Sequence, residues 1–155
     1  MLPVTETATS PCSSDCQGYV RRHLRFGWWS LLVFLTLGIL LESFHGFKAA
    51  WFVNVDQETR RLLWRLAHAH GTFFALVHIA FAATVFLMPA LQLGLRRAAS
   101  WCLMAVSIVL PSGFFFGGFG VYGGDPGLGI FLLPVGAVML FIAVFIIAWG
   151  ATANR

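Results

Sequence analysis

Charged residues are scarce in this chain, and that scarcity excludes whole classes of protein. Only 10% of the 155 residues are Asp, Glu, Lys or Arg, whereas 59% are hydrophobic. A water-soluble domain usually carries about 25% charged residues. The composition therefore leaves no room for a sizeable soluble domain. It indicates an integral, multi-pass membrane protein whose first partner is the lipid bilayer.

Basic residues give no sign of a nucleic-acid partner. The net charge is only +4, and the arginines gather at the ends of apolar runs instead of forming one patch. That arrangement is typical of residues that set membrane topology. No nucleophile–base pair and no nucleotide-binding motif is recognisable, so the sequence does not predict an independent hydrolase or transferase.

Cysteine is equally sparse. Cys12 and Cys16 lie near the N-terminus and Cys102 at the start of an apolar run. The Cys-x-x-x-Cys spacing is not followed by a second pair, so it does not predict a metal site. In a cytoplasmic tail we expect both thiols to be reduced.

The chain divides into a tail and four apolar runs. Residues 1–20 are predicted to be a disordered cytoplasmic tail and residues 21–155 a four-span membrane domain. The spans are predicted at residues 27–47, 62–88, 101–119 and 128–150. A membrane-spanning helix needs about 20 apolar residues. Joined by short loops, these runs predict an all-α protein, an antiparallel bundle of four transmembrane helices.

Lys and Arg predict the orientation of this bundle. With the N-terminus inside, the inner flanks hold Arg21, Arg22, Arg25, Arg96, Arg97 and Arg155, and the outer flanks hold Lys48, Arg60, Arg61 and Arg65. Because cytoplasmic flanks carry the excess of basic residues, both termini are predicted to lie inside, in a bacterial-type inner membrane.

Histidines and one glutamate interrupt the apolar runs. Three of the five histidines, His68, His70 and His78, fall in the second span. Glu42 and His45 are three residues apart in the first span, on one helical face. From the helix rise of about 1.5 Å per residue, all but His78 are expected at one depth in the outer leaflet, with His78 near the midplane. An ionisable group at membrane depth is costly and marks a functional site by default.

Three interpretations of this Glu/His cluster follow. In the first, which the sequence favours, it binds haem b or a transition metal ion (copper, iron or zinc) and has a redox or sensing role. Imidazole is the commonest metal ligand, and a carboxylate can complete the set. The candidate metal ligands are Glu42, His45, His68, His70 and His78, and the candidate haem ligands are His45, His68 and His70.

The second interpretation is a path for protons or a small solute along the cluster. In the third, the polar groups only fix the register of the helices. The protein is then a non-catalytic accessory subunit that packs through Gly113 and Gly117, as a homo-oligomer or beside a partner membrane subunit.

One short motif resembles a known family. Ala67-His68-Ala69-His70 looks like the His-x-His helix of the catalytic subunits of haem-copper oxidases, in which two histidines on opposite sides of one helix hold two different haems. The resemblance implies that His68 and His70 could serve two separate sites. Residues two apart are about 200° apart around a helix. We therefore expect one of these rings to face the first span and the other a later span or a second subunit.

Overall fold

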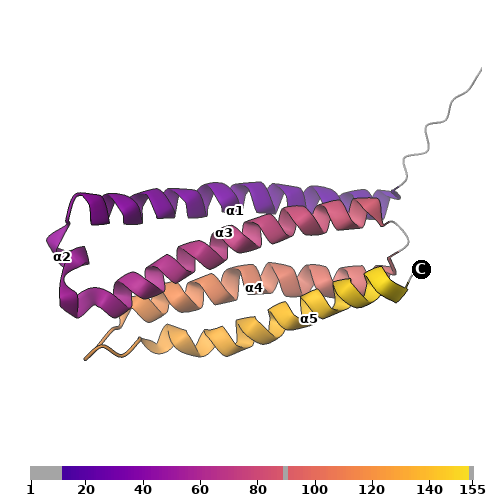
Figure 1. The fold of residues 1–155 in the computed structure, drawn as a ribbon. Coiled ribbons are helices and arrows are strands. Elements are labelled where there is room, and N and C mark those ends of the chain that lie inside the picture. The colour runs from indigo at the N-terminus through magenta and orange to yellow at the C-terminus, as the bar shows by residue number, and fades with distance from the viewer. Residues whose placement is uncertain (1–11, 89–90, 154–155) are drawn as a thin grey trace, which may run out of the picture.

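The computed structural model describes residues 12–88 and 91–153. Figure 1 shows long helices lying side by side. They are α1 (Ser14–Gly46), α3 (Glu58–Leu87), α4 (Leu93–Phe119) and α5 (Leu132–Ala153). Each of these four, α5 together with the short turn before it, is long and apolar enough to cross a membrane. The described residues thus have the helices of a multi-pass membrane protein, as the sequence predicted.

Short elements join the long helices. The turn between α1 and α3 contains α2 (Ala50–Val53) and η1 (Val55–Gln57), and η2 (Leu128–Phe131) leads into α5. The Arg61 guanidinium donates a hydrogen bond of 2.9 Å to the Phe52 carbonyl oxygen and so ties α2 to the first turn of α3.

Helix α1 begins earlier than the sequence analysis placed it. A tail without regular structure was predicted up to residue 20, yet the helix starts at Ser14; residues 1–11 lie outside the described part. The Ser13 side chain accepts a hydrogen bond from the Cys16 amide, and Asp15 lies in the first turn, so the helix start has both a cap and a favourable charge. The two reduced thiols expected here are instead joined as a Cys12–Cys16 disulfide.

Helices α3 and α4 lie at the centre of the fold. Helix α1 packs on α3, α3 on α4, and α4 on α5. Six of the nine buried positions of α3 recur at alternating intervals of four and three residues, namely Ala67, Gly71, Phe74, His78, Phe81 and Val85. This spacing is typical of helices that pack at a shallow angle with interlocking side chains.

Glycines bring α1 and α3 into close contact. A side chain at Gly27 would approach the Ala75 carbonyl oxygen to 2.9 Å, and one at Gly38 would overlap the His68 ring. On α3, a side chain at Gly71 would overlap the Phe34 ring. Small residues of this kind let the backbones of membrane helices approach each other.

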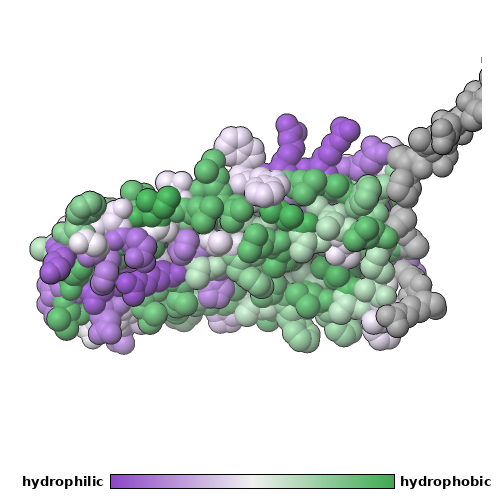
Figure 2. Space-filling model, turned by 45° about the horizontal axis from the view of Figure 1, so that its top comes forward, coloured by the Kyte–Doolittle hydropathy of each residue, from purple (hydrophilic) through white to green (hydrophobic). Residues whose placement is uncertain are grey.

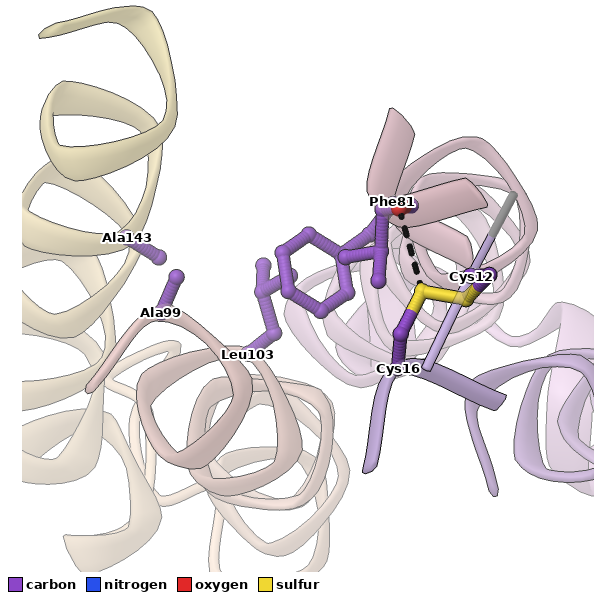
Figure 3. Close-up of a cluster of buried hydrophobic side chains, with 7 residues drawn as sticks. Cys12, Cys16, Phe81, Ala99, Leu103 and Ala143 are labelled. Atoms are coloured by element: carbon purple, nitrogen blue, oxygen red, sulfur yellow. Dashed lines mark hydrogen bonds between the residues drawn. A yellow bond between two sulfur atoms is a disulfide. The ribbon is translucent and has the colours of Figure 1, made fainter. Parts of the chain in front are cut away.

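An apolar cluster closes the end of the bundle that contains Cys16. Figure 3 shows Ala99 of α4 and Ala143 of α5 pointing toward each other, with Leu103 and then Phe81 between them and the disulfide. The Cys16 sulfur lies 3.5 Å from the Val85 carbonyl oxygen of α3.

The outer surface is largely apolar. Figure 2 shows hydrophobic side chains over most of one face, with hydrophilic ones gathered at the left end and others projecting along the top edge towards the right. Large apolar side chains on the two flanking helices are exposed, among them Trp29 of α1 at 68% and Phe141 of α5 at 72%. In a membrane this surface faces lipid, which is as apolar as the side chains.

Replacing Gly27 by Ala is expected to lower the free energy of unfolding by about 1–3 kcal/mol, because the new methyl group forces α1 away from α3. Gly18→Ala on the same helix is the matched control, because nothing lies within 4 Å of that position. It should leave stability unchanged or raise it slightly. Unfolding in SDS, followed by circular dichroism, measures both variants, and equal stability would contradict the close packing at Gly27.

Candidate functional site

A histidine pair lies at the contact between α1 and α3. His23 and His78 are both fully buried, with 0% of their surface exposed. Their Nδ1 atoms are 2.6 Å apart, which is hydrogen-bonding distance. Gly27, one turn beyond His23, allows this contact, because a side chain there would come within 3.3 Å of the His78 Cβ.

Helix α4 supplies one serine for each ring. Ser100 Oγ lies 2.8 Å from His23 Nε2, and Ser107 Oγ lies 2.8 Å from His78 Nε2. The two serines are seven residues apart, which is about two helical turns, so they share one face of α4. All four ring nitrogens therefore have a hydrogen-bond partner.

The Ser107 end fixes the direction of these hydrogen bonds. Ser107 Oγ donates to the Leu103 carbonyl oxygen at 2.7 Å, so it accepts from His78 Nε2–H. A neutral imidazole carries one N–H, and His78 Nδ1 is then the acceptor. His23 Nδ1–H must be the donor in the contact between the rings.

The other end agrees with this assignment. With its proton on Nδ1, His23 accepts at Nε2 from the Ser100 hydroxyl. Ser100 Oγ in turn accepts from the Arg22 guanidinium at 2.9 Å. One continuous chain of hydrogen bonds results, from Arg22 through Ser100, His23 and His78 to Ser107, with both rings neutral. We call it the histidine chain.

Aromatic rings surround the histidines. The Phe81 ring meets His23 edge-on at 4.6 Å between centroids, and the Phe26 ring lies 4.5 Å from that of His78. Arg22 is exposed on α1, and its guanidinium lies 4.8 Å from the centre of the Tyr19 ring. The Arg22 end of the chain thus reaches the outer surface directly.

A cavity adjoins each end of the histidine chain. Arg22 lines one of about 300 Å³ together with Ser14, Asp15, Gly18 and Tyr19. Ser107 lines another of about 410 Å³ between α1 and α4. We refer to these as the end cavity and the lateral cavity. The buried chain links the two.

Of the residues proposed from the sequence, Glu42 and His68 come together. They line a groove of about 720 Å³ along α1 and α3, which Arg65 also lines. The His68 Nδ1–H donates to the Phe34 carbonyl oxygen at 2.7 Å. The lone pair of that imidazole is therefore on Nε2.

The remaining proposed residues lie elsewhere. His70 is on the far side of α3, where its ring packs 4.7 Å from that of Phe114 on α4, and its Nδ1 bonds to the Leu66 carbonyl oxygen. His68 and His70 thus face different helices, as their angular separation predicted. His45 is exposed in the last turn of α1, and His78 belongs to the histidine chain. Within the described residues, no group of three or more His, Cys, Asp or Glu is placed to hold a metal ion.

His23 was missed in the sequence. It stands in Arg21-Arg22-His23-Leu24-Arg25, which reads as a basic flank outside the first span. The available signal was the start Ser13-Ser14-Asp15, a typical N-cap sequence. With the helix begun there, His23 and Gly27 fall on the face that also carries Cys16, at intervals of seven and four residues.

Comparison with known proteins gives no family. No family pattern matches this chain, and no curated protein or solved structure shows a significant match to it.

The histidine chain predicts a definite pair of tautomers. In protein labelled with ¹⁵N-histidine, we expect His23 to carry its proton on Nδ1 and His78 on Nε2, with a scalar coupling across the Nδ1–H···Nδ1 hydrogen bond. Ser107→Ala should perturb the His78 signals and leave those of exposed His45 unchanged. Signals from a doubly protonated ring, or an absent coupling, would contradict the assignment.

Proposed function

We propose that this protein passes protons within the membrane along the histidine chain, between the end cavity and the lateral cavity. The observation that carries the proposal is the unbroken series of hydrogen bonds through two buried imidazoles. Imidazole suits the task because the ring has two nitrogens, so that one accepts a proton while the other releases one.

The transfer balances at every atom. His23 takes a proton at Nε2 from the Ser100 hydroxyl, and Ser100 regains one from water that enters past Arg22 from the end cavity. His23 gives up its Nδ1 proton to His78 Nδ1, and His78 releases its Nε2 proton to Ser107 Oγ. Ser107 at the same time loses its own hydroxyl proton to water in the lateral cavity. Arg22 stays protonated throughout and holds Ser100 in place. The starting tautomers return when both rings and the serine hydroxyls reorient, because passing the protons back along the same hydrogen bonds would undo the transfer.

A purely structural role explains the chain less well. Hydrogen bonds between membrane helices average only about 0.6 kcal/mol. An apolar pair would fill the same space without placing four ring nitrogens in an apolar interior, where each one needs a partner. Ionisable residues inside membrane helices are commonly found in proton paths.

We also propose the orientation predicted from the sequence, an antiparallel bundle in the inner membrane with both termini in the cytoplasm. The basic flanks support it, since Arg22 lines the end cavity, Arg21 and Arg25 lie within one turn of Arg22 on α1, and Arg97 is near the start of α4. The Cys12–Cys16 disulfide counts against it, because disulfides persist mainly in oxidising compartments. In the proposed orientation the end cavity opens to the cytoplasm.

His23→Gln should reduce proton flux into liposomes by about tenfold or more. The amide can replace a hydrogen bond but cannot pass a proton from one side to the other. His45→Gln is the matched control, because His45 is an exposed histidine of the same helix. A pH-sensitive dye inside the liposomes reports the flux under an imposed potential. Equal flux in His23→Gln and the unmodified protein would refute the relay.

The groove of Glu42 and His68 supports a second candidate, the binding of haem b or a transition metal ion. Metal-ligating histidines usually donate their other N–H to a carbonyl or carboxylate, and His68 does so to Phe34. Its Nε2 lone pair and the Glu42 carboxylate would supply two ligands. Further ligands would come from a second copy of the chain or a partner membrane subunit.

Purification followed by elemental analysis and an absorption spectrum tests this candidate. If it is correct, copper, iron or zinc, or a haem absorption band, accompanies the protein. Bound metal or haem should fall by about tenfold or more in His68→Ala, which removes a ligand outright. His23→Gln should retain it. A colourless protein without metal, prepared without chelators, would refute the candidate.

A further inference from the structure

The lateral cavity has the walls of a binding site for a small lipid-soluble molecule. Its volume of about 410 Å³ falls in the range of about 300–1,000 Å³ that is typical of ligand pockets. Four phenylalanines, Phe26, Phe34, Phe115 and Phe116, and three serines, Ser30, Ser107 and Ser112, contribute to its lining. No Asp, Glu, Lys, Arg or His lies among the described residues that line it, so its chemistry suits an uncharged ligand.

The cavity is open toward the lipid side of the protein. Ile108 and Phe116 of α4, which line it, are exposed at 59% and 57%, and Val33 of α1 at 60%. These side chains face the surrounding hydrocarbon in a membrane. A ligand can therefore enter sideways from the bilayer and leave an alkyl chain there.

Pro111 adds a hydrogen-bond acceptor to this site. In a regular α-helix the amide of residue 111 would donate to the carbonyl of Ser107, but proline has no N–H. The Ser107 carbonyl is therefore deprived of its usual helical donor. Ser107 and Pro111 both line the lateral cavity, so the proline makes an acceptor available beside the end of the histidine chain.

We propose that the lateral cavity binds a lipid-soluble hydroxylated aromatic ring, such as an alkylphenol. The phenylalanines pack against the ring, and the ligand hydroxyl donates to the Ser107 carbonyl. The ligand oxygen accepts from the hydroxyl of Ser30 or Ser112. This inference rests on the proposed relay for its purpose: the ligand hydroxyl lies beside Ser107, at the end of the histidine chain.

Photo-crosslinking of the full chain in lipid nanodiscs tests the site. The probe is 4-nonylphenol with a diazirine in its alkyl chain, and mass spectrometry locates the labelled residues. We expect labelling at Val33, Ile108 and Phe116. Excess unlabelled 4-nonylphenol should reduce it by about fivefold or more. Nonylbenzene, which lacks the hydroxyl, should compete much less, because it leaves the polar groups of the site without their partner.

Two variants test whether the labelling depends on the lateral cavity itself. Ser112→Leu fills the cavity and should abolish most of the labelling, while the coupling between His23 and His78 persists and shows that the helices still pack. Ala98→Leu, at an exposed position of α4, is the matched control and should label normally. Equal competition by nonylbenzene would show a site for any apolar chain, such as a lipid tail, and would overturn the proposal.

The labelling test and the proton-flux test can each give a negative result without the other, so the two proposals can be told apart. Labelling that is unaffected by Ser112→Leu overturns the ligand site even if flux through the histidine chain is normal. Specific labelling that is retained while His23→Gln conducts as well as the unmodified protein refutes the relay and leaves the binding site in place.

Discussion

The hydrogen bond between the two Nδ1 atoms of His23 and His78 constrains the rest of the site. Two ring nitrogens can share a hydrogen bond only if one is protonated and the other is not, so the 2.6 Å contact couples the tautomers of the two rings. Each outer nitrogen then needs a partner of the opposite kind. A buried polar group without one costs about 1–3 kcal/mol, which is why a serine must stand at each end.

The helices contribute differently to meeting this need for hydrogen-bond partners. Helix α4 meets it with Ser100 and Ser107, which have the same spacing along their helix as two positions of one packing face. Helix α1 provides Gly27, without which the rings could not approach. Helix α5 packs on the opposite side of α4 and contributes nothing to the chain. The polar chemistry therefore depends on three helices, and the fourth only covers α4.

Local properties of the sequence were enough to predict the spans, because apolar length is a property of each segment alone. Helix rise also predicted Glu42 and His68 at a similar depth, and both line one groove. The direction of each side chain around its helix could not be predicted in this way, because packing decides it. Gly38 leaves room for the His68 ring against α1, while the His70 ring packs on Phe114 of α4. The role of His23 depended on a helix start at Ser14 that a basic flank concealed.

The same packing divides the histidines of α3 between two separate regions. His68 and His78 are ten residues apart, about 15 Å along the helix axis, and Phe34 of α1 lies between their levels. Its ring fills the space that Gly71 leaves open, and its carbonyl holds His68. An aromatic layer thus separates the groove of Glu42 from the histidine pair along the contact of α1 with α3. Beyond His23, the hydrogen bonds of His78 lead to Ser107 of α4 and so to the lateral cavity.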